Sequence, residues 1–228
     1  MWGEPANEKH WPPPDRRVGT TNTAHQPPDP RLPPTVLLFD LGGVLVENAT
    51  FDELAKLFPA MTDAEALKER WLRSPAVATY ERGETSEAVF ASSFATEWAL
   101  DEAKETFLQR FVGWPRGPYP GAVELLAGLR GRCTTAILSN CNGTHWPAMA
   151  PLTDIVDHAF SSHLMRIGKP DPAAFAHVCA AIGCAPGDVL FFDDSPTNVR
   201  AAQATGMAAE QVEGFDALLE GLARRGLV

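Results

Sequence analysis

Three short apolar runs in the sequence each end in polar side chains that could do chemistry. The residues after these runs are Asp40, then Ser139 with Asn140, then Asp193 with Asp194. Unbroken rather than alternating apolarity is typical of a strand that is covered on both faces, as in a parallel sheet. Ligands of such sheets bind at the carboxyl ends of the strands, near the point where the strand order reverses. We therefore expect these side chains to lie together at one edge of a sheet.

Each of these polar residues also has a simple structural explanation. An Asp at a strand end is a common turn former, and Ser139 with Asn140 could merely begin a loop. The combination is harder to explain in this way, because three carboxylates brought together repel one another unless protons or a cation neutralise them. A hard divalent cation such as Mg²⁺ prefers oxygen ligands and keeps several waters. The pattern therefore favours a magnesium site.

The elements that must position these residues follow one another as strand, helix, strand. We predict strands at 35–39, 134–138 and 189–192 and helices that begin at Pro120, Pro172 and Pro196 and stop near Gly131, Gly183 and Gly206. This order is typical of an α/β fold with a parallel sheet.

Between the first strand and the first of these helices, the pattern changes to helices alone. A capping box at 62–65 precedes Leu67, Trp71 and Leu72, a second helix carries Val89, Phe90, Phe94 and Trp98, and a third spans 101–112. We expect residues 48–118 to form an all-helical cap inserted into a Rossmann-like core of residues 35–47 and 119–228.

Composition narrows the classes of partner. The chain has 228 residues, 45% of them hydrophobic, with 19 Lys and Arg against 29 Asp and Glu, which gives a formal net charge of −10. An acidic protein repels polyanions, so we expect neither nucleic acid nor an anionic membrane as a partner. No apolar run approaches the roughly 18 residues that span a bilayer, and the first five residues do not resemble a signal peptide, so we expect a cytoplasmic protein.

Two further features concern order and redox chemistry. Residues 1–34 hold nine of the 20 prolines and little apolar surface, and we expect them to be a disordered arm. The four cysteines show no CxxC spacing, and we expect neither a disulfide framework nor a zinc site.

Four motifs in order resemble those of the haloacid dehalogenase superfamily. They are Phe39 to Leu45 (FDLGGVL), Ile137 to Asn140 (ILSN), Gly168 to Pro172 (GKPDP) and Phe191 to Asn198 (FFDDSPTN). The resemblance covers residues 35 to about 212. The segment Tyr80 to Glu84 (YERGE) looks like part of the small helical cap, and the whole is most similar to the α-glucose-1-phosphate phosphatase-like branch.

The resemblance implies a nucleophile and a metal site. Asp40 would accept a phosphoryl group as an aspartyl phosphate, which divides one hard displacement into two easier ones. Mg²⁺ would be held by the Asp40 carboxylate, the Gly42 carbonyl and Asp194, with Asp193 acting directly or through water. Asn198 would orient this loop by hydrogen bonding.

It also implies a phosphate site. The Ser139 hydroxyl and the Asn140 backbone N–H would bind the phosphoryl oxygens, while Lys169 would neutralise the growing negative charge and keep Asp40 ionised. We expect Arg82 of the cap to contact the substrate. Weaker candidates for substrate contact are Tyr80, Glu84, His145 and Trp146.

One position departs from the commoner pattern of the family. Phosphatases of this family often carry a second Asp, the general acid and base, two residues after the nucleophile, and here that position is Gly42. Loss of a positioned general acid costs on the order of 10²- to 10⁴-fold in rate. The anomeric phosphates of the resembling branch release an acidic hydroxyl and need less proton transfer. Turnover should therefore depend steeply on the leaving group.

The hypothesis is a Mg²⁺-dependent phosphatase for a small phosphorylated metabolite, a sugar phosphate, working as a monomer or homodimer. One alternative is a 2-haloacid dehalogenase, which shares the nucleophile but uses no metal. Another is a catalytically weak phosphate-binding regulatory protein that has lost efficient turnover through Gly42. The pair Asp193 and Asp194 disfavours the dehalogenase, because it would repel a carboxylate substrate in the absence of a cation.

Overall fold

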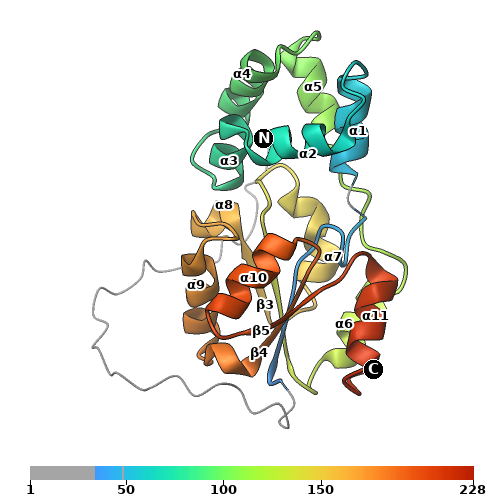
Figure 1. Cartoon of the computed structure of the whole chain (residues 1–228), viewed down its shortest axis with the longest axis vertical. Coiled ribbons are helices and arrows are strands. Elements are labelled where there is room, and N and C mark those ends of the chain that lie inside the picture. Colours follow the sequence, from blue (N-terminus) through green and yellow to red (C-terminus); the bar gives the residue numbers. More distant parts are fainter. Residues whose placement is uncertain (1–33, 48) are drawn as a thin grey trace, which may run out of the picture.

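A five-stranded parallel sheet forms the centre of the computed structural model, which describes residues 34–47 and 49–228 (Figure 1). The strands lie in the order β3 (His158–Ser161), β2 (Thr134–Ser139), β1 (Val36–Phe39), β4 (Val189–Asp193), β5 (Ala208–Gln211). The chain builds outward from β1 in one direction and then returns to build outward in the other. The strand order therefore reverses beside β1, and the predicted α/β fold with a parallel sheet is confirmed.

The central strands are buried on both faces because alternate side chains enter two different hydrophobic cores. Leu37 and Phe39 point into a core shared with α6 (Ala122–Leu129) and α11 (Phe215–Ala223). Val36 and Leu38 point into the other, which is shared with α9 (Pro172–Ile182) and α10 (Pro196–Ala204). The remaining short elements of the core are η1 (Trp146–Met149), α7 (Ala150–Thr153), α8 (Ser162–Met165) and η2 (Pro186–Asp188).

The helix starts predicted from proline are confirmed at Pro172 and Pro196 and wrong at Pro120. Helix α6 begins at Ala122, because Gly121 in a left-handed conformation (φ 90°) occupies the N-cap position. Helix α9 ends as predicted, with Gly183 as its left-handed C-cap.

Residues 50–114 form a separate helical unit above the carboxyl ends of the strands (Figure 1). Its helices are α1 (Thr50–Leu57), α2 (Ala64–Leu72), α3 (Pro75–Glu81), α4 (Glu87–Trp98) and α5 (Lys104–Phe111). They pack around an aromatic core in which Phe90, Phe94 and Phe107 are almost fully buried.

Three details of this unit differ from the sequence predictions. The N-cap of α2 is Asp63, whose carboxylate accepts from the N–H groups of Glu65 and Ala66, so the expected capping box at 62–65 does not form. Leu72 and Val89 were assigned to the apolar faces but are 67% and 49% exposed. Trp71 and Phe90, one position away along each helix, fill the core instead.

Two linkers join the helical unit to the sheet. Val46 and Pro118 pair as an isolated antiparallel bridge, and the N–H of Tyr119 donates to the carbonyl of Leu45 at 2.9 Å. The two crossings therefore run side by side, just beyond the first motif.

Strands β3 and β5 have no counterpart in the sequence prediction. Both are four-residue edge strands, and β5 is mostly accessible, so neither has the continuous apolar run of a central strand. The predicted disordered arm lies outside the described residues except for Pro34. Within the described residues, none of the helices has the length and apolarity that crossing a membrane requires.

Candidate active site

Strand register brings the predicted strand-end residues to one place. Phe39 of β1 pairs with Ile137 of β2 and with Phe192 of β4, so Asp40, Ser139 and Asp193 reach the same edge of the sheet. These three residues are 8%, 5% and 0% exposed. Buried polar groups of this kind require partners in the protein or a ligand.

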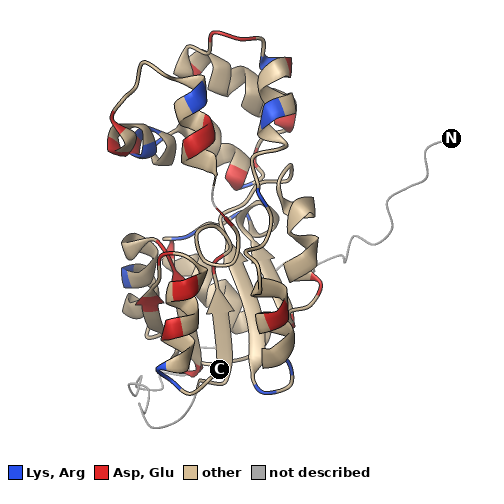
Figure 2. Cartoon of the chain, turned by 90° about the vertical axis from the view of Figure 1, so that its right-hand side faces the viewer, with Lys and Arg blue, Asp and Glu red and all other residues tan. Residues whose placement is uncertain are grey.

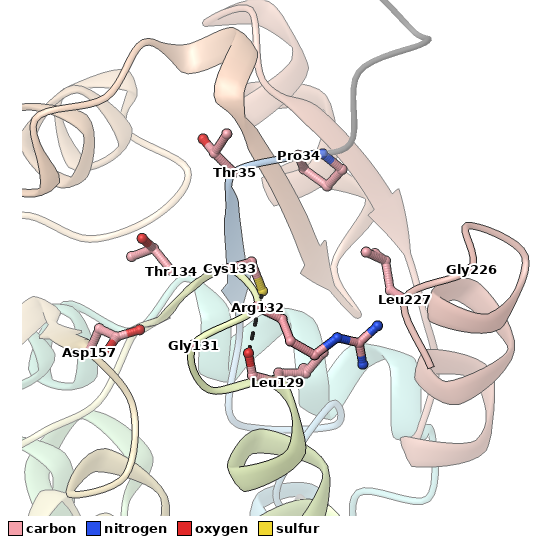
Figure 3. A pocket seen from close by; sticks show the side chains of 10 residues that line it. All are labelled: Pro34, Thr35, Leu129, Gly131, Arg132, Cys133, Thr134, Asp157, Gly226 and Leu227. Atoms are coloured by element: carbon pink, nitrogen blue, oxygen red, sulfur yellow. Dashed lines mark hydrogen bonds between the residues drawn. The ribbon is translucent and has the colours of Figure 1, made fainter.

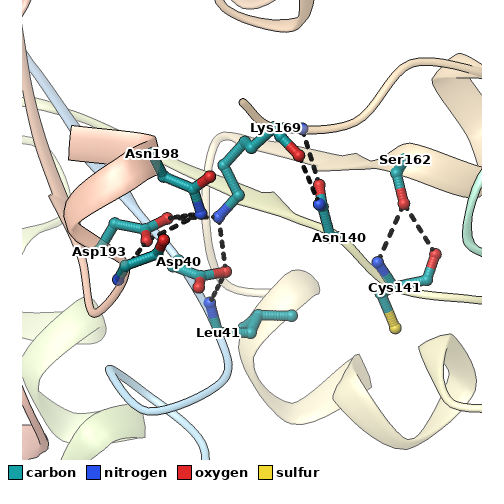
Figure 4. Close-up of polar contacts among 9 residues, drawn as sticks. Asp40, Leu41, Asn140, Cys141, Ser162, Lys169, Asp193 and Asn198 are labelled. Carbon is teal, nitrogen blue, oxygen red and sulfur yellow. Dashed lines mark hydrogen bonds and ion pairs between the residues drawn. The ribbon is translucent and has the colours of Figure 1, made fainter. Parts of the chain in front are cut away.

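The buried Lys169 connects two of these carboxylates (Figure 4). Its Nζ lies 2.8 Å from Oδ1 of Asp40 and 2.6 Å from Oδ2 of Asp193. Burial alone would lower the pKa of Lys169, but the charges of Asp193 and Asp40 outweigh burial and raise it. The lysine therefore remains a cation beside the proposed nucleophile.

Asn140 fixes the backbone of Lys169 with its side chain. Its Nδ2 donates to the Lys169 carbonyl at 2.7 Å, and its Oδ1 accepts from the Lys169 N–H at 2.8 Å (Figure 4). A Cβ on the neighbouring Gly168 would lie 3.0 Å from the same oxygen, so a larger residue there would displace the Asn140 amide by a few tenths of an ångström. The role predicted for Asn140 concerned its backbone N–H, and this second role of its side chain was not predicted.

Both carboxylate oxygens of Asp193 already have protein donors. Oδ1 accepts from the Ser195 N–H at 2.8 Å and from Nδ2 of Asn198 at 3.0 Å, while Oδ2 accepts from Lys169. Asn198 therefore orients the Asp193 carboxylate itself. With its oxygens so occupied, Asp193 is better suited to contact a metal through water than directly.

Asp40, Asp193 and Asp194 form a cluster that fits a divalent cation. One carboxylate oxygen from each lies within 4.8 Å of the others. Three carboxylates and the Lys169 ammonium leave a charge of −2, which a hard divalent cation with oxygen ligands would neutralise. Burial, together with the charges of Asp193 and Asp194, raises the pKa of Asp40 to about 7 against the lowering by Lys169. The cluster thus holds more negative charge than its own residues can balance.

The chain also makes room for this cluster. Gly43 has a left-handed backbone (φ 73°), and a Cβ at this position would lie 2.8 Å from Oδ2 of Asp194. Glycine adopts such a conformation without strain. Gly42, whose carbonyl is the fourth predicted metal ligand, directly precedes it and pairs with Val46 in an isolated bridge.

A cavity of about 800 Å³ separates this cluster from the helical unit. Lys169, Asn140 and Asp194 line it from the core. Glu81, Arg82, Trp71 and Leu72 line it from the helical unit, so the exposed apolar Leu72 belongs to the wall of this cavity.

The candidate substrate contacts in the cap and on the loop after β2 mostly bond to other protein groups. Arg82 lines the cavity, and its Nε and Nη2 donate to the Glu84 carboxylate at 2.7 and 2.9 Å. The Tyr80 hydroxyl bonds Thr144, and Nε2 of His145 bonds the carbonyl of Phe111 at 2.7 Å. The contacts of Tyr80 with Thr144 and of His145 with Phe111 join the helical unit to the core.

Trp146 also has a structural position. It begins the turn η1, packs against the hydrophobic core, and approaches the ring of His163 edge-on.

Two residues near the site were missed by sequence reasoning. The Ser162 hydroxyl donates to the carbonyl of Glu81 at 2.5 Å. It also contacts Cys141, whose N–H donates to it at 3.0 Å and whose carbonyl oxygen lies 3.1 Å away (Figure 4). Glu81 lines the cavity, and its carboxyl is near enough to Asp40 and Lys169 for their charges to act on it. Glu81 lies at a helix C-terminus, where the helix dipole disfavours a negative charge. This unusual position of an acid is the sequence feature that could have pointed to it.

A second cavity, of about 670 Å³, lies near the start of β1 and β2 (Figure 3). Its acid, Asp157, is used structurally, since Oδ2 accepts from the N–H of Thr135 at 2.8 Å and from its Oγ1 at 3.1 Å. The other lining residues do not add a cluster of titratable groups, so the cavity above Asp40 is the candidate active site.

The chain belongs to the haloacid dehalogenase-like hydrolase family, whose model matches residues 34–206. It is 30% identical over 197 residues to the phosphoglycolate phosphatase of Rhodospirillum rubrum, covering 76% of this chain and 77% of the relative. It is 31% identical over 142 residues to a phosphatase of Mycobacterium tuberculosis, covering 59% of this chain and 65% of the relative. The predicted enzyme class, a hydrolase of this superfamily, is confirmed.

Solved structures share the fold. A HAD family enzyme from Bacteroides thetaiotaomicron, solved with magnesium and inorganic phosphate, has a TM-score of 0.64 at 22% identity and covers 79% of this chain and 94% of its own. The L-2-haloacid dehalogenase of Xanthobacter autotrophicus has a TM-score of 0.56 at 23% identity and covers 85% and 84%. At these identities the likeness supports the fold, and the activity has to be argued from the site.

Proposed function

We propose that this protein is a Mg²⁺-dependent phosphatase that hydrolyses a small phosphorylated metabolite, a sugar phosphate, through an aspartyl-phosphate intermediate. The observation that carries the proposal is the cluster in which Lys169 bridges Asp40 and Asp193 beside Asp194. It combines a nucleophile, a fixed cation and a surplus of negative charge suited to a divalent metal. We further place the chain in the α-glucose-1-phosphate phosphatase-like branch, on the motifs and on Gly42.

In this proposal each core residue has a defined task. An Asp40 carboxylate oxygen attacks phosphorus, while the Ser139 hydroxyl and the Asn140 N–H hold the phosphoryl oxygens. Lys169, held by Asn140, keeps Asp40 ionised and balances charge as the leaving oxygen departs. Asp40, the Gly42 carbonyl and Asp194 would hold Mg²⁺, with Asp193 acting through water, and the ion would neutralise charge at the phosphoryl group. Water then hydrolyses the acyl phosphate and restores Asp40.

The charge of the site supports a phosphatase over a 2-haloacid dehalogenase. Asp193 and Asp194 lie close enough to Asp40 to repel the carboxylate of a haloacid. The buried carboxylates and Lys169 also argue against a protein that only binds phosphate, since a nucleophile beside a fixed cation is arranged for group transfer.

The surroundings of the site agree with a small-molecule substrate. We take residues 48–118 as the cap that covers the substrate and the chain as a cytoplasmic enzyme, monomeric or homodimeric. Acidic and basic residues are interspersed on the outer helices in the view of Figure 2, which is not the pattern of a nucleic-acid-binding face. Arg82, which lines the cavity, is the proposed contact for the non-reacting part of the substrate.

The test is release of inorganic phosphate from a panel of sugar and other metabolite phosphates, with Mg²⁺ and with EDTA. We expect turnover that requires Mg²⁺ and is lost in Asp40→Asn. Halide release from 2-chloropropionate in EDTA, without phosphate release from the panel, would favour the dehalogenase instead.

A further inference from the structure

The cavity contains one acid that the roles above leave unused. Three acidic side chains line it, namely Glu81, Asp171 and Asp194. Asp194 belongs to the carboxylate cluster, and Asp171 caps α9 by accepting from the Ala173 N–H at 2.9 Å. Glu81 has no hydrogen bond or ion pair from its carboxyl to any of the described residues. Its carboxyl is therefore available to a ligand in the cavity.

Backbone contacts hold Glu81 above the reacting groups. Glu81 is the last residue of α3, and its carbonyl shares the Ser162 hydroxyl with Cys141, which follows the proposed phosphate-binding pair Ser139 and Asn140. Two residues further on, Gly83 packs so closely on the core that a Cβ would lie 2.4 Å from the carbonyl oxygen of His163. The end of α3 is thus fixed against the loop that follows β2.

The charges that face Glu81 come from the core and from its own helix. Asp40 and Lys169 act on it from the core, Arg82 acts from the adjacent position, and the Cys141 thiol lies near it. Burial, together with the charge of Asp40, raises the pKa of Glu81 to about 8 against the opposing charges of Lys169 and Arg82. Because Arg82 bonds Glu84 with two nitrogens, it does not form an ion pair with Glu81. The carboxyl therefore carries its proton at neutral pH.

We propose that Glu81 is the general acid and base of this enzyme, supplied by the cap in place of the acid that is missing at Gly42. This inference rests on the proposed phosphatase function. As Asp40 attacks phosphorus and the bond between phosphorus and the leaving oxygen breaks, the Glu81 carboxylic acid gives its proton to that oxygen. The Glu81 carboxylate then takes a proton from the water that attacks the aspartyl phosphate. Phosphate leaves, and Asp40 and the Glu81 acid are restored.

The test uses esters with different leaving groups. Glu81→Gln keeps the size of the side chain and cannot transfer a proton. With a primary alkyl phosphate, whose leaving oxygen needs a proton, kcat/KM should fall about 10²- to 10⁴-fold. With 4-nitrophenyl phosphate, whose leaving group is acidic, kcat/KM should change much less. With the same ester kcat should fall, because hydrolysis of the aspartyl phosphate needs the base. The alkaline limb of the kcat/KM profile for the alkyl ester should also disappear.

Two further variants serve as controls. Glu69→Gln removes an exposed carboxylate of the same unit that pairs with Arg73, and it should match the wild type with both esters. Glu81→Asp keeps an ionisable acid and should retain the alkaline limb, which covers the case in which Glu81→Gln does not fold.

The outcomes separate the two proposals. A wild type that releases phosphate from neither ester, nor from the metabolite panel, would refute the phosphatase itself. A wild type that is active, with Glu81→Gln either equal to Glu69→Gln or slowed equally with both esters in kcat/KM, would overturn the role of Glu81 alone. If Glu81→Gln does not fold, loss of the alkaline limb in Glu81→Asp would overturn the role of Glu81 instead.

Discussion

Replacing Lys169 with Met tests whether the carboxylate cluster depends on this one buried cation. The substitution keeps an unbranched side chain but leaves Asp40 and Asp193 without the ammonium that lies 2.8 and 2.6 Å from them. Removing one partner of a buried ion pair costs about 3–5 kcal/mol, because the remaining charge is uncompensated. In a chain of this length each kcal/mol lowers the melting temperature by about 2–4 °C. We therefore expect Lys169→Met to melt about 6–20 °C below the wild type.

The assay is thermal unfolding in EDTA at pH 8 and again at pH 5.5, with Lys56→Met as the matched control. Lys56 is 62% exposed and pairs with Glu53 on the surface of α1, so its loss should cost at most about 1 kcal/mol. The drop in melting temperature of Lys169→Met should be smaller at pH 5.5, where protonation neutralises the unpaired carboxylates. Mg²⁺ at 100 times its Kd should return about 2.7 kcal/mol to a variant that still binds it. A melting temperature within about 2 °C of the wild type at pH 8 would refute the reasoning.

Three other predictions concern the same cluster. Asp40→Asn should abolish phosphate release and raise the melting temperature of the metal-free protein at pH 8, because it removes one of three mutually repelling carboxylates; turnover near the wild-type rate would exclude Asp40 as the nucleophile. The pKa of Asp40 is raised to about 7, so the native state binds more protons than the unfolded state between about pH 4 and 7. The free energy of unfolding of the metal-free protein should therefore fall as pH rises across this range, by up to about 1.4 kcal/mol per pH unit for each proton. Urea unfolding in EDTA measures this slope, and a rise in stability over the same range would contradict it. Gly43→Ala should lower the free energy of unfolding by about 1–3 kcal/mol and weaken Mg²⁺ binding in calorimetry, because its Cβ would press on Asp194 from a strained backbone. Gly113→Ala, whose Cβ would make an ordinary contact, should bind Mg²⁺ normally.

The sequence was most informative where one physical cause dominates. The three central strands could be predicted because burial on both faces forces an unbroken apolar run. The edge strand Ala208–Gln211 is partly exposed and has no such run, so pairing with β4 rather than its own composition makes it a strand. The start of α6 depends on the backbone angle of Gly121, and the adjacent Pro120 suggests an earlier start.

The same distinction applies to the site. Asp40 and Asp193 could be placed side by side because the carboxyl ends of parallel strands meet at one edge. The side-chain pairing of Asn140 with Lys169 joins segments 29 residues apart, and that of Ser162 with Glu81 joins segments 81 residues apart. The Asn140 contact depends on how two loops of the core meet, and the Ser162 contact on how the helical unit docks on the core. No local pattern in the sequence encodes either.

An acid on the cap has a different consequence from an acid at position 42. An acid two residues after Asp40 would belong to the same rigid strand end as the nucleophile and would be in place whether or not the cap covered the site. Glu81 reaches the site only while α3 rests on the core through Ser162. Proton transfer would then require the closed arrangement, in which the cavity excludes bulk water and the electrostatic effect of Lys169 on the phosphoryl group is strongest. Gly42 and Glu81 together would make leaving-group departure conditional on a covered substrate, which also limits attack by stray water before the phosphoryl group has moved to Asp40.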